Sequence, residues 1–103
     1  MSASRRSFVV ACLALVAVAS AAAAEVQVAV AANFAAPVGR ISEAFTAATG
    51  HTLKVSTGST GKFYSQIVSG APFEVLLAAD DETPRRLAAE GHAVAGTQTT
   101  YAI

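Results

Sequence analysis

The sequence is poor in cysteine and in charge, and it has no tryptophan. Its one cysteine, Cys12, lies in an N-terminal leader, so the rest of the chain contains no thiol. This excludes a disulfide framework and a thiolate metal site. Seven Lys and Arg residues balance seven Asp and Glu residues among 103 residues. No basic patch stands out, so the pattern does not indicate a nucleic-acid partner.

Residues 1–24 are predicted to be a cleaved secretory signal peptide. Arg5 and Arg6 precede an apolar run over residues 8–19, and Ala22 and Ala24 fit the A-x-A cleavage rule. Cleavage is expected between Ala24 and Glu25, with the mature chain delivered to the periplasm. The segment "SRRSF" resembles a twin-arginine signal, so export in the folded state is a second possible route.

The predicted mature chain, residues 25–103, is small and slightly acidic. Because the leader contains Arg5 and Arg6, five Lys and Arg residues remain against seven Asp and Glu residues, a formal charge of −2. A compact domain more often has roughly 100 to 150 residues. The sequence also stops within a segment that has the pattern of a strand, so we expect a truncated domain.

Strands and helices are predicted to alternate along residues 25–103. Short apolar segments predict strands over residues 25–31, 53–57, 73–78 and 98–103. The first changes from alternating to wholly apolar, as in a strand buried on both faces. This order predicts an α/β fold with a parallel sheet and helices on both faces.

Three helices are predicted between these strands. The first has an apolar face and ends before Gly50, and the second ends near Gly70. The third is predicted to have Thr83 as its N-cap and Pro84 at its first position, and to end at Gly91. The apolar faces of the first two helices consist of Val38, Ile41, Phe45 and Ala48, and of Phe63 and Ile67.

The segments "AANF" and "GSTG" each lead from a strand into a helix. Ligands of parallel α/β sheets lie beyond the carboxyl ends of the strands, where helix N-termini offer unpaired N–H groups. Asn33, Ser59 and Thr60 add amide and hydroxyl donors, which suit an ionised oxyanion. The same residues are also ordinary helix caps, so capping without a ligand stays open as the alternative.

Other binding chemistries fit the sequence less well. "GSTGKFY" resembles a phosphate-binding P-loop, but Ser56 replaces its first glycine and Phe63 replaces the magnesium-binding hydroxyl. A P-loop phosphotransferase is therefore not expected. The acidic run at residues 80–82 is expected to favour the start of the third helix rather than to bind a metal. Lys62 is expected on the exposed side of its helix.

Three segments closely resemble the periplasmic molybdate-binding proteins of ABC transporters. They are "VQVAVAANFAAPVGRISEAFTAATGH", "GSTGKFYSQIVSGAPFEVLLAADDETPRRLAAEG" and "AVAGTQTTYAI", which together cover almost all of residues 25–103. The resemblance implies the first lobe of a two-lobed, type II periplasmic-binding-protein fold. Residues 25–103 would then be the N-terminal part of that lobe.

The resemblance also implies a ligand and a site. Molybdate, and also tungstate, would be held as an oxyanion between the lobes, with Ala32, Asn33, Ser59 and Thr60 as ligands from this chain. It implies no catalysis, no cofactor and no directly bound metal cation. The implied partners are the membrane permease subunits of an ABC importer, and the implied state is a monomer.

The chain departs from the family pattern in its length. The family's remaining ligands, a tyrosine among them, lie in and beyond a second lobe, so Tyr101 is not assigned the role of that tyrosine. Another oxyanion such as sulfate, or a truncated fragment that binds nothing, stays open as an alternative.

Overall fold

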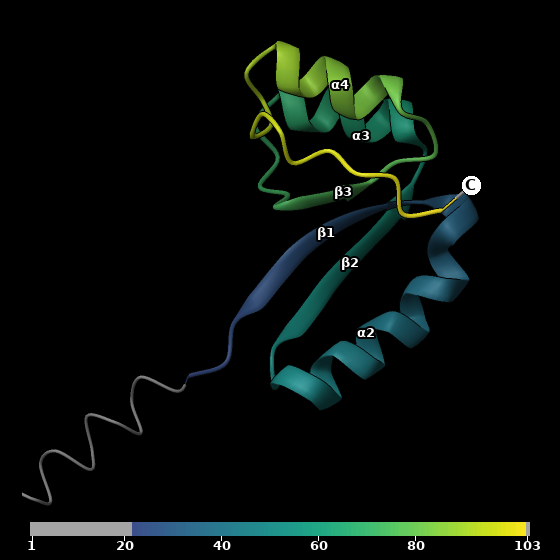
Figure 1. Ribbon diagram of the computed structural model, residues 1–103, viewed down its shortest axis with the longest axis vertical. Coiled ribbons are helices and arrows are strands. Elements are labelled where there is room, and N and C mark those ends of the chain that lie inside the picture. Colours follow the sequence, from purple (N-terminus) through teal and green to yellow (C-terminus); the bar gives the residue numbers. More distant parts are fainter. Residues whose placement is uncertain (1–21, 103) are drawn as a thin grey trace, which may run out of the picture.

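The computed structural model describes residues 22–102. Most of the predicted signal peptide, residues 1–21, and Ile103 lie outside the described residues. Within residues 22–102, no helix combines the length and the apolar character needed to cross a membrane. Figure 1 shows the elements in chain order: β1 (Glu25–Ala31), the short 3-10 helix η1 (Ala32–Phe34), α2 (Ala35–Thr49), β2 (Thr52–Gly58), α3 (Thr60–Val68), β3 (Val75–Leu77) and α4 (Glu82–Ala89).

The described strands form one parallel sheet in the order β2-β1-β3. β1 pairs with β2 along its whole length, from Glu25 opposite Thr52 to Ala31 opposite Gly58. Figure 1 shows α2 on one side of this sheet and α3 and α4 on the other. The predicted α/β fold with a parallel sheet is therefore confirmed.

β1 is the central strand, and its two faces pack against different layers. Successive side chains of a strand point to opposite faces. Val28 and Val30 pack with Val38 of α2 in a buried cluster. The alternate residues Ala29 and Ala31 are also buried, at 0% and 2% exposure. The predicted burial of this strand on both faces is confirmed.

The apolar face predicted for the first helix is only partly buried. Val38 is 3% exposed, whereas Ile41 is 50% exposed. Phe45 is half-buried and Ala48 is exposed. The helix ends as predicted, with Gly50 in the left-handed conformation at φ +77°. That conformation favours glycine because other residues carry a Cβ atom that clashes there.

The predicted start of the third helix was wrong. α4 begins at Glu82 with Asp81 as its N-cap, so Thr83 and Pro84 both lie within its first turn. The Thr83 N–H donates to Oδ1 of Asp80 over 2.9 Å. A carboxylate is a strong acceptor for these unpaired N–H groups, which moves the helix start towards Asp80. Pro84 is tolerated because N–H groups of the first turn have no intrahelical acceptor.

The predicted fourth strand, residues 98–103, does not form in its described part. Residues 98–102 have no regular structure, and β3 is shorter than predicted, at three residues. Side chains hold this segment instead: Gln98 Nε2 donates to the Asp81 carbonyl over 2.9 Å. A strand requires a neighbour for its backbone groups, and here side chains make the contacts.

Candidate functional site

The structure brings the two predicted ligand loops together at one edge of the sheet. β1 and β2 are parallel, and their last pair is Ala31 opposite Gly58. Ala32, which opens η1, and Ser59, which precedes α3, therefore leave neighbouring strands side by side. Ala32, Asn33 and Ser59 are exposed and Thr60 is half-buried.

Ser59 is the N-cap of α3. Its Oγ accepts the Lys62 N–H over 3.2 Å. The capping role that the sequence analysis left open is therefore present at this residue. A serine hydroxyl both accepts and donates, so accepting this bond leaves its O–H group able to donate elsewhere.

Thr60 joins the loop after β2 to the loop after β3. Its Oγ1 accepts the Ala79 N–H over 3.1 Å. The Thr60 O–H group can still donate to a ligand, because the bond from Ala79 occupies only an acceptor position. The Lys62 N–H donates to Ser59 Oγ, and the other N–H groups of the first turn of α3 have no intrahelical acceptor. This edge of the sheet therefore offers hydrogen-bond donors.

The carboxylates near this edge serve the start of α4. Asp80 accepts from the N–H and, over 3.2 Å, from the hydroxyl of Thr83. Asp81 pairs with Arg85 over 3.2 Å. Within the described part of the chain, no three His, Cys, Asp or Glu side chains gather into a group that could hold a metal ion. Lys62 is exposed, as predicted.

The geometry does not fit a P-loop. β2 ends at Gly58 and α3 begins at Thr60, so Ser59 alone separates the strand from the helix. A P-loop wraps several consecutive backbone N–H groups around the phosphates. One connecting residue cannot do this. Phe63, which stands where a P-loop has its magnesium-binding hydroxyl, has no oxygen ligand and is buried at 4% exposure.

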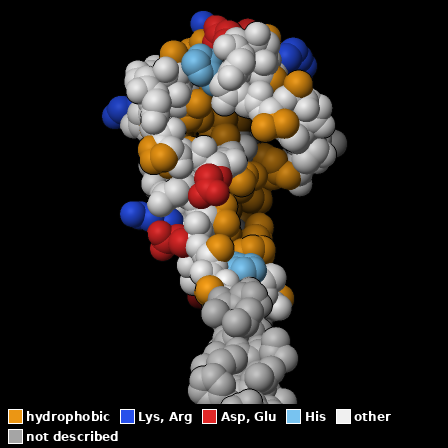
Figure 2. Space-filling model, turned by 90° about the vertical axis from the view of Figure 1, so that its left-hand side faces the viewer, with side chains coloured by type: hydrophobic (Ala, Val, Ile, Leu, Met, Phe, Trp, Pro, Cys, Tyr) orange, Lys and Arg blue, Asp and Glu red, His pale blue; other side chains and the backbone are white. Residues whose placement is uncertain are grey.

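A groove of about 1100 Å³ lies between β3, α4 and the segment after α4. Of the predicted ligand residues, only Asn33 lines it. Much of its lining is apolar, including Phe73, Leu76 and Leu87. Figure 2 shows hydrophobic side chains gathered in a hollow on one face of the molecule. A groove of this size and polarity does not match a small oxyanion, so we place the candidate site at the strand ends instead.

Tyr101 makes contacts at these strand ends that were not predicted from the sequence. The Tyr101 hydroxyl donates to the Ala78 carbonyl over 2.8 Å. Its ring meets the Phe34 ring edge-on, with 4.8 Å between the centroids. Tyr101 lies far along the chain from both ligand loops, and no local pattern in the sequence indicates these contacts.

Comparisons with known proteins identify close relatives. The family described as bacterial extracellular solute-binding protein matches residues 26–103. The chain is 56% identical over 103 residues to the molybdate-binding protein ModA of Azotobacter vinelandii, covering all of this chain and 41% of that protein. It is 51% identical over 79 residues to the Rhodobacter capsulatus ModA, covering 77% of this chain and 31% of that protein.

A solved structure also matches this chain. The periplasmic molybdate-binding protein of Azotobacter vinelandii matches with a TM-score of 0.74 and 40% identity, over 76% of this chain and 34% of that one. The resemblance drawn from the sequence, and the fold class that it implied, are confirmed. The chain spans less than half the length of these relatives.

Proposed function

The chain belongs to the family of bacterial extracellular solute-binding proteins, and on that basis we propose that residues 25–103 bind molybdate. The proposal extends to tungstate, to the periplasm as location after removal of residues 1–24, and to delivery of the anion to the permease subunits of an ABC importer. The identity to two molybdate-binding proteins supports the choice of anion.

The chemistry of the strand ends supports an oxyanion ligand. Molybdate is a dianion without protons at neutral pH, so its oxygen atoms only accept hydrogen bonds. The observation that carries the proposal is that the Ser59 and Thr60 hydroxyls act as hydrogen-bond acceptors within the chain. Each already accepts an N–H group of this chain, from Lys62 and Ala79, which leaves its O–H group to donate outwards. Asn33 adds an amide donor from the neighbouring loop.

Binding and release of the anion involve no chemical step in this proposal. Residues 25–103 are proposed as the N-terminal part of the first lobe, acting as a monomer and supplying one side of the site. Replacing the water around a dianion requires donors on all sides. The remaining donors would come from a second lobe. This chain covers 41% of the Azotobacter protein, so the rest of that protein's length has no counterpart in residues 1–103.

Thermal unfolding of residues 25–103 with and without molybdate or sulfate tests the proposal. A ligand at 100 times its Kd adds roughly 2.7 kcal/mol to the free energy of unfolding. We expect stabilisation by molybdate and not by sulfate, and loss of that effect on Asn33→Ala. Stabilisation by sulfate alone would identify another oxyanion as the ligand.

A chimera tests the same residues within the longer chain of a relative. Residues 25–103 would replace the matching segment of the Azotobacter vinelandii protein, and calorimetry would measure the Kd for molybdate and tungstate. We expect both anions to bind and Asn33→Ala to weaken both. A folded chimera that binds neither anion would overturn the proposed function.

A further inference from the structure

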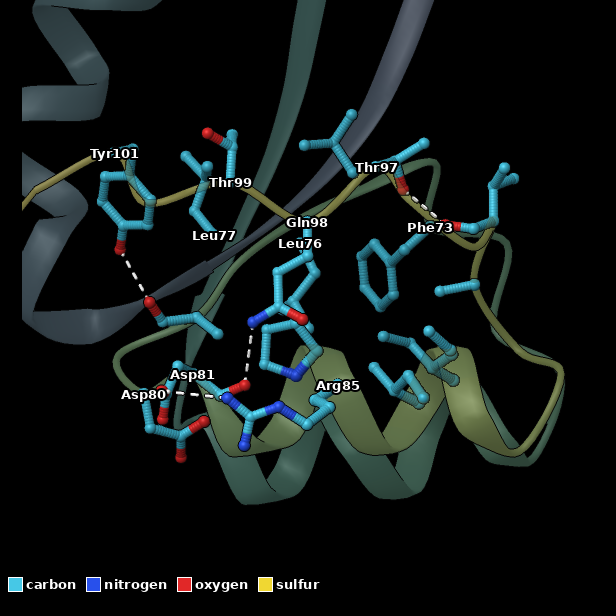
Figure 3. A pocket seen from close by; sticks show the side chains of 18 of the residues that line it. Phe73, Leu76, Leu77, Asp80, Asp81, Arg85, Thr97, Gln98, Thr99 and Tyr101 are labelled. Carbon is cyan, nitrogen blue, oxygen red and sulfur yellow. Dashed lines mark hydrogen bonds and ion pairs between the residues drawn. The ribbon is translucent and has the colours of Figure 1, made fainter.

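Tyr101 connects the segment after α4 to the carboxyl ends of two strands. Figure 3 shows its hydroxyl directed at the loop after β3. The acceptor there is the Ala78 carbonyl, and the bond is part-buried although Tyr101 is 42% exposed. Ala78 itself is buried at 8% exposure. This hydrogen bond joins two segments that lie 23 positions apart in the chain.

The peptide group that Tyr101 contacts also contacts Thr60. The Ala78 carbonyl and the Ala79 N–H are the two ends of one planar peptide unit. The carbonyl accepts from Tyr101 over 2.8 Å, and the N–H donates to Thr60 Oγ1 over 3.1 Å. Tyr101 is therefore joined to Thr60 through a single peptide group.

The ring of Tyr101 reaches the second ligand loop. It packs edge-on against Phe34 with an angle of 60° between the ring planes. Phe34 is the last residue of η1 and follows Asn33 directly. One side chain thus contacts the neighbour of Asn33 and the peptide group that donates to Thr60.

We propose that Tyr101 is a positioning residue for the oxyanion site. This inference rests on the proposed function of Asn33 and Thr60. Hydrogen bonds in a chain polarise one another, so a donor on the Ala78 carbonyl strengthens the Ala79 N–H as a donor. The stronger bond to Thr60 Oγ1 makes the Thr60 O–H a better donor to an anion. The Phe34 contact holds η1 against the same side chain.

The test compares two substitutions that each remove one tyrosine hydroxyl. Tyr101→Phe keeps the ring and its contact with Phe34 but removes the bond to Ala78. Tyr64→Phe is the matched control, because the Tyr64 hydroxyl bonds Glu90 between α3 and α4, away from the site. In the chimera, we expect Tyr101→Phe to weaken molybdate binding by on the order of three- to tenfold, and Tyr64→Phe to leave the Kd unchanged.

A second substitution separates positioning from general stability. In a Thr60→Val background the hydroxyl through which Tyr101 acts is gone, so Tyr101→Phe should change the Kd by less than about twofold. In the NMR spectrum of the protein without anion, Tyr101→Phe should shift the Ala79 amide proton, and Tyr64→Phe should not.

Each contrary result has a distinct meaning. An unchanged Kd in Tyr101→Phe, or an equal loss with and without the Thr60 hydroxyl, would overturn the positioning role. An unmodified chimera that folds without binding molybdate would overturn the proposed function, and the positioning role with it.

Discussion

The parallel sheet has one edge formed by the amino ends of its strands and one formed by their carboxyl ends, and the polar groups at these two edges bond differently. At the amino-terminal edge, donors and acceptors of the chain satisfy one another. Glu74 Oε1 accepts the Gln27 N–H over 3.0 Å, and the Glu74 N–H donates to the Gln27 carbonyl over 2.9 Å. His51 Nδ1 accepts the Ala24 N–H over 3.0 Å. These bonds join neighbouring segments and give this edge a structural role.

At the carboxyl-terminal edge, two hydroxyls that follow β2 act as acceptors within the chain. Ser59 and Thr60 each receive an N–H group from within the chain. Their own O–H groups can therefore donate outwards, beside the exposed Asn33. Side chains accept backbone N–H groups at both edges, but a hydroxyl that accepts keeps an O–H donor, whereas the Glu74 carboxylate has none. The donors left after the internal bonds form, rather than the number of polar residues, therefore distinguish the candidate anion site from the structural edge.

Thr60→Val is the strongest test of that difference. It preserves the shape of the side chain but removes the outward donor and the acceptor for Ala79. A hydrogen bond to a charged group contributes about 1.5 to 3 kcal/mol. Molybdate affinity of the chimera, measured by calorimetry, should therefore fall on the order of ten- to a hundredfold. Thr60→Ser keeps the hydroxyl and should bind nearly as well as the unmodified protein.

Lys62→Ala is the control for charge at the same edge. Lys62 is exposed, and its contact with Ser59 uses the backbone N–H, which the substitution keeps. The Kd should change by less than about threefold, as expected for a solvent-screened charge. A larger loss for Lys62→Ala than for Thr60→Val would mean that charge, and not the hydroxyl, holds the anion.

Glu74→Ala tests the amino-terminal edge. It removes the acceptor of the Gln27 N–H, so the free energy of unfolding should fall by about 1 kcal/mol. Molybdate affinity should stay unchanged, because Glu74 lies at the opposite edge from Thr60. Urea unfolding and calorimetry measure the two quantities, and Glu43→Ala, at an exposed position of α2, is the matched control. An affinity loss in Glu74→Ala would remove the distinction between the edges.

The elements that the sequence predicted correctly depend on local patterns. β1 follows from its alternating and then apolar residues, and the end of α2 follows from Gly50. The start of α4 was misplaced because the Asp80 carboxylate accepts the Thr83 N–H, so the helix begins before Thr83. The fourth strand was wrong because strand formation depends on a neighbour that a local pattern does not specify.

The candidate site divides in the same way. Asn33 and Thr60 could be predicted because each follows a predicted strand, and parallel strands bring their carboxyl ends together. The link from Thr60 to Ala79 joins residues 19 positions apart, and the link from Tyr101 to Ala78 joins residues 23 positions apart. Such contacts depend on how the helices and loops pack, and no spacing rule predicts them.

The smallest expected effect concerns Tyr64, which lies away from the strand ends, between α3 and α4. Its hydroxyl donates to Glu90, and the Arg86 guanidinium lies 4.4 Å from its ring centroid. The hydrogen bond to Glu90 raises the pKa of Tyr64 above its ordinary value of 10.0, and Arg86 partly opposes this. Above about pH 10, the folded state therefore holds this proton more strongly than the unfolded state.

The stabilisation linked to Tyr64 should thus be complete below about pH 10 and be lost as the pH rises through the folded-state pKa. Phenolate absorbance and urea unfolding across this range would measure the titration and the stability. Glu90→Gln removes the charged acceptor and should return the pKa towards 10.0, while Tyr64→Phe should remove this part of the pH dependence. Neither substitution should alter molybdate affinity at neutral pH. A change in molybdate affinity in either variant would show that the α3–α4 contact influences the site at the strand ends. The polar groups at the carboxyl ends of the strands would then not determine the affinity by themselves.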